Sequence, residues 1–95
     1  MTVARKATLA KFAKKYPGAR KPLQRFLDIA LAANWPHFPA VKDSFPSTDY
    51  AASTGTLIFD IGGNKYRLIA RVDFLERVLV VQEVLTHEQY NRRQL

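Results

Sequence analysis

Apolar residues recur every three or four positions in two segments near the start of the chain, residues 3–16 and 19–34. This spacing gives each segment one apolar stripe and predicts two amphipathic helices. The stripes consist of Leu9, Phe12, Ala13 and Tyr16, then Leu23, Phe26, Leu27, Ala30 and Leu31. Pro17 and Gly18 end the first segment. With so short a connection, the two helices are expected to form a helical hairpin.

A third, shorter apolar pattern follows these segments. Phe38, Val41 and Phe45 are spaced for one or two further helical turns, and Pro46 ends them. Residues 47–55 are polar and are expected to form a loop.

The second half of the chain is typical of strands. Residues 56–61, 64–72 and 78–85 are rich in Val, Ile, Leu, Phe and Tyr. The Gly-Gly-Asn sequence at 62–64 offers residues that accept positive φ, as a tight hairpin turn requires. The expected fold class is therefore α+β, with an N-terminal helical hairpin packed on an antiparallel three-stranded sheet. Residues 1–95 suit a single domain.

Positive charge is concentrated in the first half of the chain. Residues 1–48 hold nine basic and two acidic side chains and so carry the whole net charge of +7, whereas residues 49–95 hold six of each sign. A concentrated positive surface attracts nucleic acid, an anionic membrane or an acidic protein. The alternative is that these charges only keep the helices solvated. A membrane role is not expected, because the helices lack large apolar anchors.

Several kinds of site are excluded by what the sequence lacks. It has no cysteine and two histidines, so we expect no disulfide, no metal site and no cofactor, and it has no phosphate-binding or dinucleotide motif. Lys6, Lys11, Lys14 and Lys15 interrupt the N-terminal apolar residues, so we do not expect this segment to be a signal peptide. No run nears the ~20 apolar residues of a membrane span. A cytoplasmic location is expected.

The first predicted hairpin has a charged face and an apolar face. Depending on which residues form the turn, Asp60 lies opposite Lys65 or opposite Arg67. In either register the side chains of one face are Ile58, Asp60, Lys65, Arg67, Ile69 and Arg71, a basic stripe with one acid. The other face is apolar and is expected to pack on the helices. An acid opposite a cation is also an ordinary cross-strand pair, so this pattern alone does not establish function.

A short polar segment follows the last predicted strand. His87 and Tyr90 are three residues apart, so one helical turn would place them side by side. Imidazole is well suited to proton transfer near neutral pH. His37, between Pro36 and Phe38 in a connecting segment, is expected to be an ordinary surface residue.

Two stretches of the sequence resemble the signature of HigB-type toxins, which belong to the RelE-like toxins. They are Phe-Asp-Ile-Gly-Gly-Asn-Lys-Tyr-Arg-Leu-Ile-Ala at 59–70 and Val-Leu-Thr-His-Glu-Gln-Tyr at 84–90. In that family an F-I-G-N-K-Y-R-L hairpin leads through one more strand to T-H-x-x-Y. The resemblance covers nearly the whole chain, and the two motifs together are fairly specific.

The resemblance implies a toxin of a type II toxin–antitoxin system, a ribosome-associated mRNA interferase. It implies a helix-turn-helix antitoxin of the HigA type as partner, and operator DNA that is bound only by the complex with the antitoxin. The expected reaction is RNA cleavage without metal, by attack of the RNA 2′-hydroxyl on the neighbouring phosphate.

The motif positions suggest a role for each candidate residue. Arg67 and Lys65 are expected to hold the phosphate, His87 to transfer a proton, and Tyr90 to stack on a base or share the proton transfer. Arg71 is expected to contact the RNA backbone. Four helix lysines are expected to bind ribosomal RNA: Lys11, Lys14, Lys15 and Lys21.

Two other functions stay open from the sequence. A non-catalytic RNA- or ribosome-binding protein would need the basic charge but neither His87 nor Tyr90. A protein-interaction module would use the same basic surface to bind an acidic partner.

Overall fold

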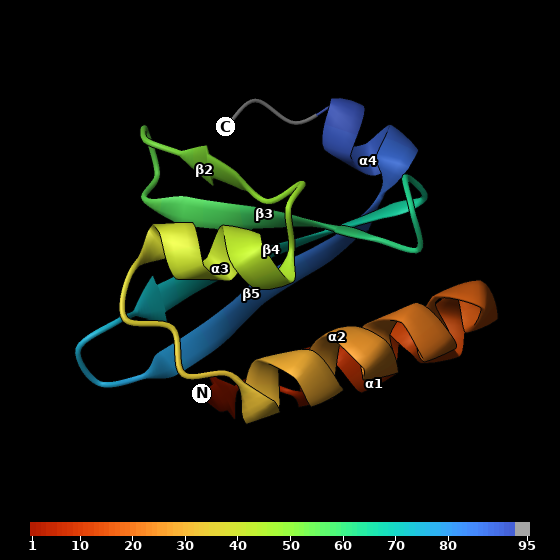
Figure 1. Ribbon diagram of the computed structural model, residues 1–95. Helices are drawn as coiled ribbons and strands as arrows, with labels where there is room; N and C mark the ends of the chain where they lie inside the picture. Colours follow the sequence, from red (N-terminus) through yellow and green to blue (C-terminus); the bar gives the residue numbers. More distant parts are fainter. Residues whose placement is uncertain (93–95) are drawn as a thin grey trace.

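The structure, a computed structural model, describes residues 1–92 and has the α+β class that the sequence predicts (Figure 1). Its strands form one five-stranded mixed sheet in the order β1-β5-β4-β3-β2. The strands are β1 (Thr2–Ala4), β2 (Asp49–Ala51), β3 (Thr56–Ile61), β4 (Tyr66–Asp73) and β5 (Val78–Thr86). The helices are α1 (Ala7–Lys15), α2 (Arg20–Ala32), α3 (Phe38–Ser44) and α4 (His87–Asn91), with a single 3-10 turn, η1 (Pro17–Ala19), before α2.

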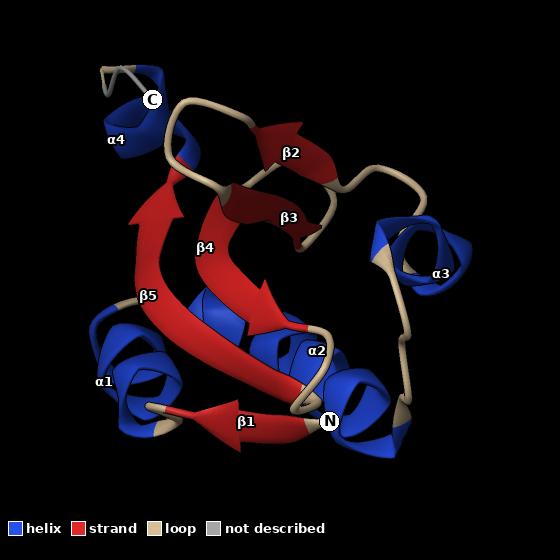
Figure 2. Ribbon diagram, turned by 90° about the vertical axis from the view of Figure 1, so that its left-hand side faces the viewer, coloured by secondary structure: helices blue, strands red, loops and turns tan. Residues whose placement is uncertain are grey.

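The prediction of a three-stranded sheet was incomplete. The three predicted strands exist with nearly the predicted bounds, but β1 adds parallel to β5 and β2 adds antiparallel to β3 (Figure 2). Both added strands have only three residues, too few to show alternation of apolar and polar side chains. In β2 two of the three residues are exposed, so its sequence has the composition of a loop.

The helical hairpin is present but does not begin the chain. The predicted helix at 3–16 starts only at Ala7, because Val3 belongs to β1 and is buried against the helices and the sheet. Between strand and helix, Arg5 has φ 66°, which turns the chain into α1. At the other end, Pro17 opens η1 rather than a plain loop.

One face of the sheet forms the main core together with α1 and α2. Phe26 of α2 and Phe59 of β3 are fully buried, and their ring centroids lie 4.9 Å apart. Phe45, which follows α3, packs its ring 5.2 Å from that of Phe26. The third apolar pattern is therefore confirmed as a short helix that helps to cover the core. His37 is exposed, and its side chain accepts a hydrogen bond from the N–H of Ala40 at the start of α3.

The register of the β3–β4 hairpin is the second of the two that the sequence allowed. Asp60 pairs with Arg67 and Ile61 with Tyr66, which leaves residues 62–65 in the turn. Gly62 and Gly63 have φ of 63° and 73°, conformations that side chains other than glycine rarely adopt.

The second face of the sheet is less exposed to solvent than its charged residues suggest. Ile58, Ile69 and Leu85 are buried and form a small second cluster, against which Ala51 of β2 and Tyr90 of α4 pack. The predicted basic stripe is thus divided by an apolar patch. None of the helices within residues 1–92 combines the length and hydrophobicity that a membrane crossing needs.

Candidate active site

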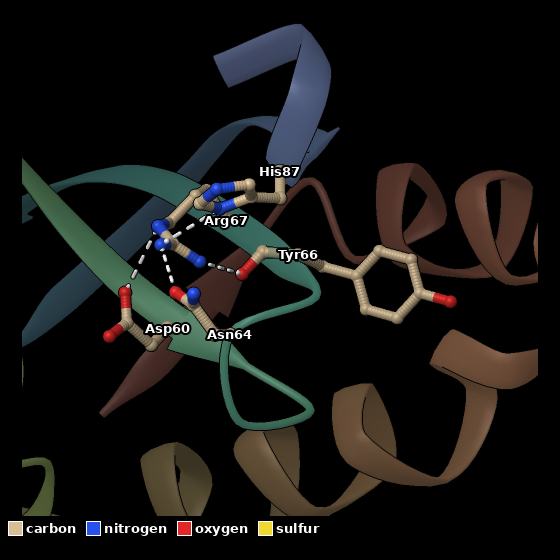
Figure 3. Close-up of polar contacts among 5 residues, drawn as sticks. All are labelled: Asp60, Asn64, Tyr66, Arg67 and His87. Carbon is tan, nitrogen blue, oxygen red and sulfur yellow. Dashed lines mark hydrogen bonds and ion pairs between the residues drawn. The ribbon is translucent and has the colours of Figure 1, made fainter. Parts of the chain in front are cut away.

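Arg67 is the centre of a polar cluster on the face of the sheet that turns away from α1 (Figure 3). Because side chains alternate along β4, the Arg67 side chain points to the opposite face of the sheet from the Tyr66 side chain. The ring of Tyr66 packs edge-on against Phe12 of α1. The Arg67 side chain is only 10% exposed. A cation this buried requires partners, and each of them can be named.

Arg67 donates to groups from the strand beside it and from the turn. Its Nε lies 3.1 Å from Oδ1 of Asp60, the cross-strand neighbour. Its Nη1 donates to the carbonyl oxygen of Tyr66 at 3.1 Å, and its Nη2 donates to Oδ1 of Asn64. Asp60 is the acid that balances the buried charge, and its own side chain is 27% exposed.

The helix α4 covers the guanidinium from the other side. The ring of Tyr90 lies 5.5 Å from the Arg67 guanidinium carbon, a cation–π contact. A capping box fixes the start of α4: the Thr86 side chain accepts from the N–H of Gln89, and the Gln89 side chain accepts from the N–H of Thr86. The N–H of His87 donates to the carbonyl oxygen of Lys65 at 2.8 Å, which ties α4 to the turn.

His87 reaches the same guanidinium through its ring. Its Nδ1 lies 3.2 Å from Nη2 of Arg67. Because arginine has no acceptor atom, Nδ1 must accept here, and the proton of the neutral imidazole is then on Nε2. The lone pair of His87 therefore faces Arg67 rather than open space. His87 can accept a proton only after this contact is broken or the ring is turned.

The model of the HigB toxin family, described as the RelE-like toxic component of a toxin–antitoxin system, matches residues 19–93, well over half of the chain. This chain belongs to the HigB toxin family. Both motifs identified in the sequence fall inside the matched residues, and the resemblance drawn from them is confirmed.

Curated relatives of this HigB-family chain carry names that agree with the family. The mRNA interferase HigB of Escherichia coli O6:H1 is 24% identical over 93 residues, which is 97% of this chain and 90% of the relative. The mRNA interferase toxin HigB of Escherichia coli strain K12 and the mRNA interferase HigB of Shigella flexneri are each 29% identical over 80 residues, which is 83% of this chain and 77% of each relative.

The fold brings together most of the residues that the sequence singled out as catalytic. Arg67 is in direct contact with both His87 and Tyr90. Lys65 stands next to them in the turn, and its side chain is exposed. Arg71 is exposed four residues further along β4, about 13 Å from Arg67 at the usual rise of a strand.

The four helix lysines are exposed, and the three on α1 lie apart from this cluster. Lys11, Lys14 and Lys15 are on α1, which packs on the opposite face of the sheet (Figure 2). Lys21, on α2, lines a hollow beside the β3–β4 turn.

Sequence reasoning missed Asn64 and undervalued Asp60. Asn64 looked like a turn residue that accepts positive φ, yet only the two glycines take that conformation, and Asn64 instead accepts from Arg67. Asp60 looked like an ordinary cross-strand partner, but it balances the charge of a buried arginine. Within residues 1–92, no three His, Asp or Glu side chains are grouped so that they could share a metal ion.

Proposed function

We propose that this HigB-family toxin is an RNA endonuclease that cuts mRNA at the Arg67 cluster. The observation that carries the proposal is the direct contact of Arg67 with His87 and Tyr90, beside the exposed Lys65. These side chains can bind a phosphate, move a proton and stack on a base. The relatives that this chain resembles are named mRNA interferases, which agrees with that chemistry.

The proposed reaction needs no group beyond the RNA and these side chains. The 2′-oxygen of the RNA loses its proton and attacks the adjacent phosphorus, and the bond from phosphorus to the 5′-oxygen of the next nucleotide breaks. The products are a 2′,3′-cyclic phosphate and a 5′-hydroxyl, which takes up a proton. Positive charge near the phosphate stabilises the transition state, and Lys65 and Arg67 supply it.

Arg67 and His87 must exchange partners when RNA enters. Four of the five guanidinium N–H groups are used by Asp60, Tyr66, Asn64 and His87. A phosphate that accepts from Nη2 would release Nδ1 of His87, which then becomes available as a base. Tyr90, stacked on the guanidinium, would be left to stack on a base or to donate a proton.

The proposal extends to the setting in which the toxin works. We infer cleavage of mRNA on the ribosome, independent of metal, in the cytoplasm. We also infer neutralisation by a HigA-type helix-turn-helix antitoxin whose complex with the toxin binds operator DNA. Support for RNA as the target comes from the net charge of +7, because phosphates attract a basic surface.

A second function is favoured by one observation. Because Arg67 is 10% exposed and mostly satisfied by protein partners, its role could be structural. The protein would then inhibit translation by binding to the ribosome without cutting RNA.

Inducible expression followed by primer extension on a translated mRNA separates the two functions. Wild type is expected to produce new 5′ ends, and the Arg67→Ala and His87→Ala variants are expected to lose them. The control is His37→Ala, which removes the other, exposed histidine and should leave the ends unchanged. Circular dichroism must show that each variant is folded.

Each outcome of this experiment has a distinct meaning. Growth arrest without new ends would favour the non-catalytic function. A folded Arg67→Ala variant that still makes the ends would contradict the role given to Arg67.

A further inference from the structure

A hollow of about 330 Å³ lies beside the Arg67 cluster, between α2, the end of α3 and the β3–β4 turn. Its volume is within the range of small-molecule binding sites. The residues that line it include Lys21, Arg25 and Ile29 of α2, Phe45 and Asp60. Asp60 is thus a lining residue of the hollow and also the partner of Arg67.

One wall of the hollow is apolar and suited to a flat ring. Phe45 is half-buried, with one side packed against Phe26 and Phe59, and Ile29 is 36% exposed. The turn beside them carries no side chain at Gly63, where an added Cβ would meet nothing within 4 Å. Apolar and aromatic walls with open access are what an unstacked RNA base needs.

The rim of the hollow is positive. Lys21 and Arg25 are four residues apart on α2, so they project from the same side of the helix. Both are exposed, and within residues 1–92 neither forms a salt bridge. Two neighbouring cations without a counter-charge are stabilised by a phosphate.

Asp60 gives the hollow a chemical preference. Its Oδ1 is paired with Arg67, and Asp60 is the acidic residue among those that line the hollow. A carboxylate accepts hydrogen bonds and cannot donate them. It therefore favours bases with amino groups, and guanine above all, because its N1–H and amino group form two adjacent donors.

We propose that this hollow, which we call the α2–turn subsite, binds a nucleotide of the RNA next to the bond that is cut. The base enters between Ile29 and Phe45 with its donor edge toward Asp60. Its phosphate lies on Lys21 and Arg25. The inference rests on the proposed nuclease function, and it adds that Asp60 links the choice of base to the position of Arg67.

A binding experiment tests the subsite without depending on cleavage. Short RNAs with a 2′-O-methyl group at every sugar have no free 2′-hydroxyl and cannot be cut by 2′-oxygen attack. One such RNA carries guanine bases and the other carries uracil bases. Fluorescence anisotropy measures their affinity for the full chain. Wild type should prefer the guanine oligonucleotide, and Arg25→Ala should weaken its binding about tenfold or more while changing uracil binding less.

Two further variants make the result specific. Arg20→Ala removes an exposed cation from the same helix that faces a different groove, and it should keep the preference for guanine. Ile29→Trp fills the hollow without changing charge, and it should remove the preference. Equal losses for Arg20→Ala and Arg25→Ala, or a guanine preference that survives Ile29→Trp in a folded protein, would overturn the subsite.

The same variants in a cleavage assay keep the two proposals distinguishable. If wild type binds guanine selectively but cuts no RNA, the nuclease function fails and the subsite stands. If wild type cuts RNA and the Arg25→Ala and Ile29→Trp variants keep its base preference around the cut, the subsite fails and the nuclease function stands.

Discussion

At the scale of single residues, Arg67 combines a structural and a proposed chemical role. A buried guanidinium is costly unless it is paired, and here Asp60 provides the opposite charge while Asn64 and the Tyr66 carbonyl accept further N–H groups. The planar guanidinium, with its paired N–H groups, is also well suited to bind phosphate. The side chain is therefore fixed in the orientation that the protein partners require, and substrate must compete with them.

Replacing Arg67 by lysine tests the structural role. Lysine keeps the charge but cannot reach Asp60, Asn64 and the Tyr66 carbonyl at once, so these groups lose donors. We expect the free energy of unfolding in urea to fall by about 1–3 kcal/mol. Arg71→Lys, on the exposed part of the same strand, should change it by no more than about 0.5 kcal/mol. Similar losses for both variants would show that the contacts of Arg67 add little stability.

Only part of this cluster could be predicted from the sequence. Alternation along a strand puts Asp60, Lys65 and Arg67 on one face, but the choice of partner for Asp60 depends on the length of the turn. The role of Asn64 depends on the two glycines before it, since their positive φ values set its direction. The pattern of apolar and polar residues near Asn64 does not reveal the turn length or these backbone angles.

At the scale of elements, the longer strands could be predicted from the sequence and the shortest could not. The six residues of β3 include four large apolar ones and were predicted with the observed bounds. The three residues of β1 do not alternate visibly, and their parallel pairing with β5 joins parts of the chain more than 70 residues apart. Such pairing depends on the whole fold, and the sequence nearby does not encode it.

The helix α4 is too short to be stable alone. With five residues it has little more than one turn, and isolated helices need about 12 or more. It is held by the Thr86–Gln89 capping box, by the His87 N–H on the Lys65 carbonyl, and by Tyr90 against the second cluster. Its position, and with it that of His87, therefore depends on the cap.

We expect Thr86→Ala to loosen α4 and slow RNA cleavage. Losing the cap costs about 1 kcal/mol, which corresponds to an approximately fivefold smaller equilibrium constant for docking of the helix. Hydrogen exchange should speed up in α4, cleavage should slow by a few-fold, and the melting temperature should change little. The control is Thr2→Ala on the exposed edge strand β1. Full activity despite faster exchange in α4 would mean that docked α4 is not needed for cleavage.

At the scale of the whole molecule, the sheet separates two basic regions. Lys11, Lys14 and Lys15 are exposed on α1, on one side of the sheet, whereas the Arg67 cluster lies on the other side under α4 (Figures 2 and 3). The sequence showed that the first half of the chain is basic, but only the fold shows that these lysines cannot reach the same phosphate as Arg67. They suit a second contact with a large RNA.

A salt titration of ribosome binding tests this division. If the α1 lysines contact ribosomal RNA, affinity should fall steeply between about 50 and 200 mM salt, because bound phosphates release counterions. Replacing Lys11, Lys14 and Lys15 by glutamine should reduce the slope of log K against log salt by about 0.7–0.9 for each lysine that contacts a phosphate. Cleavage of a short free RNA, where wild type shows it, should be nearly unchanged, because that RNA needs only the Arg67 cluster. Lys42→Gln, an exposed change on α3, is the single-site control. An unchanged slope in the triple variant would mean that the α1 lysines serve only to keep the helix solvated.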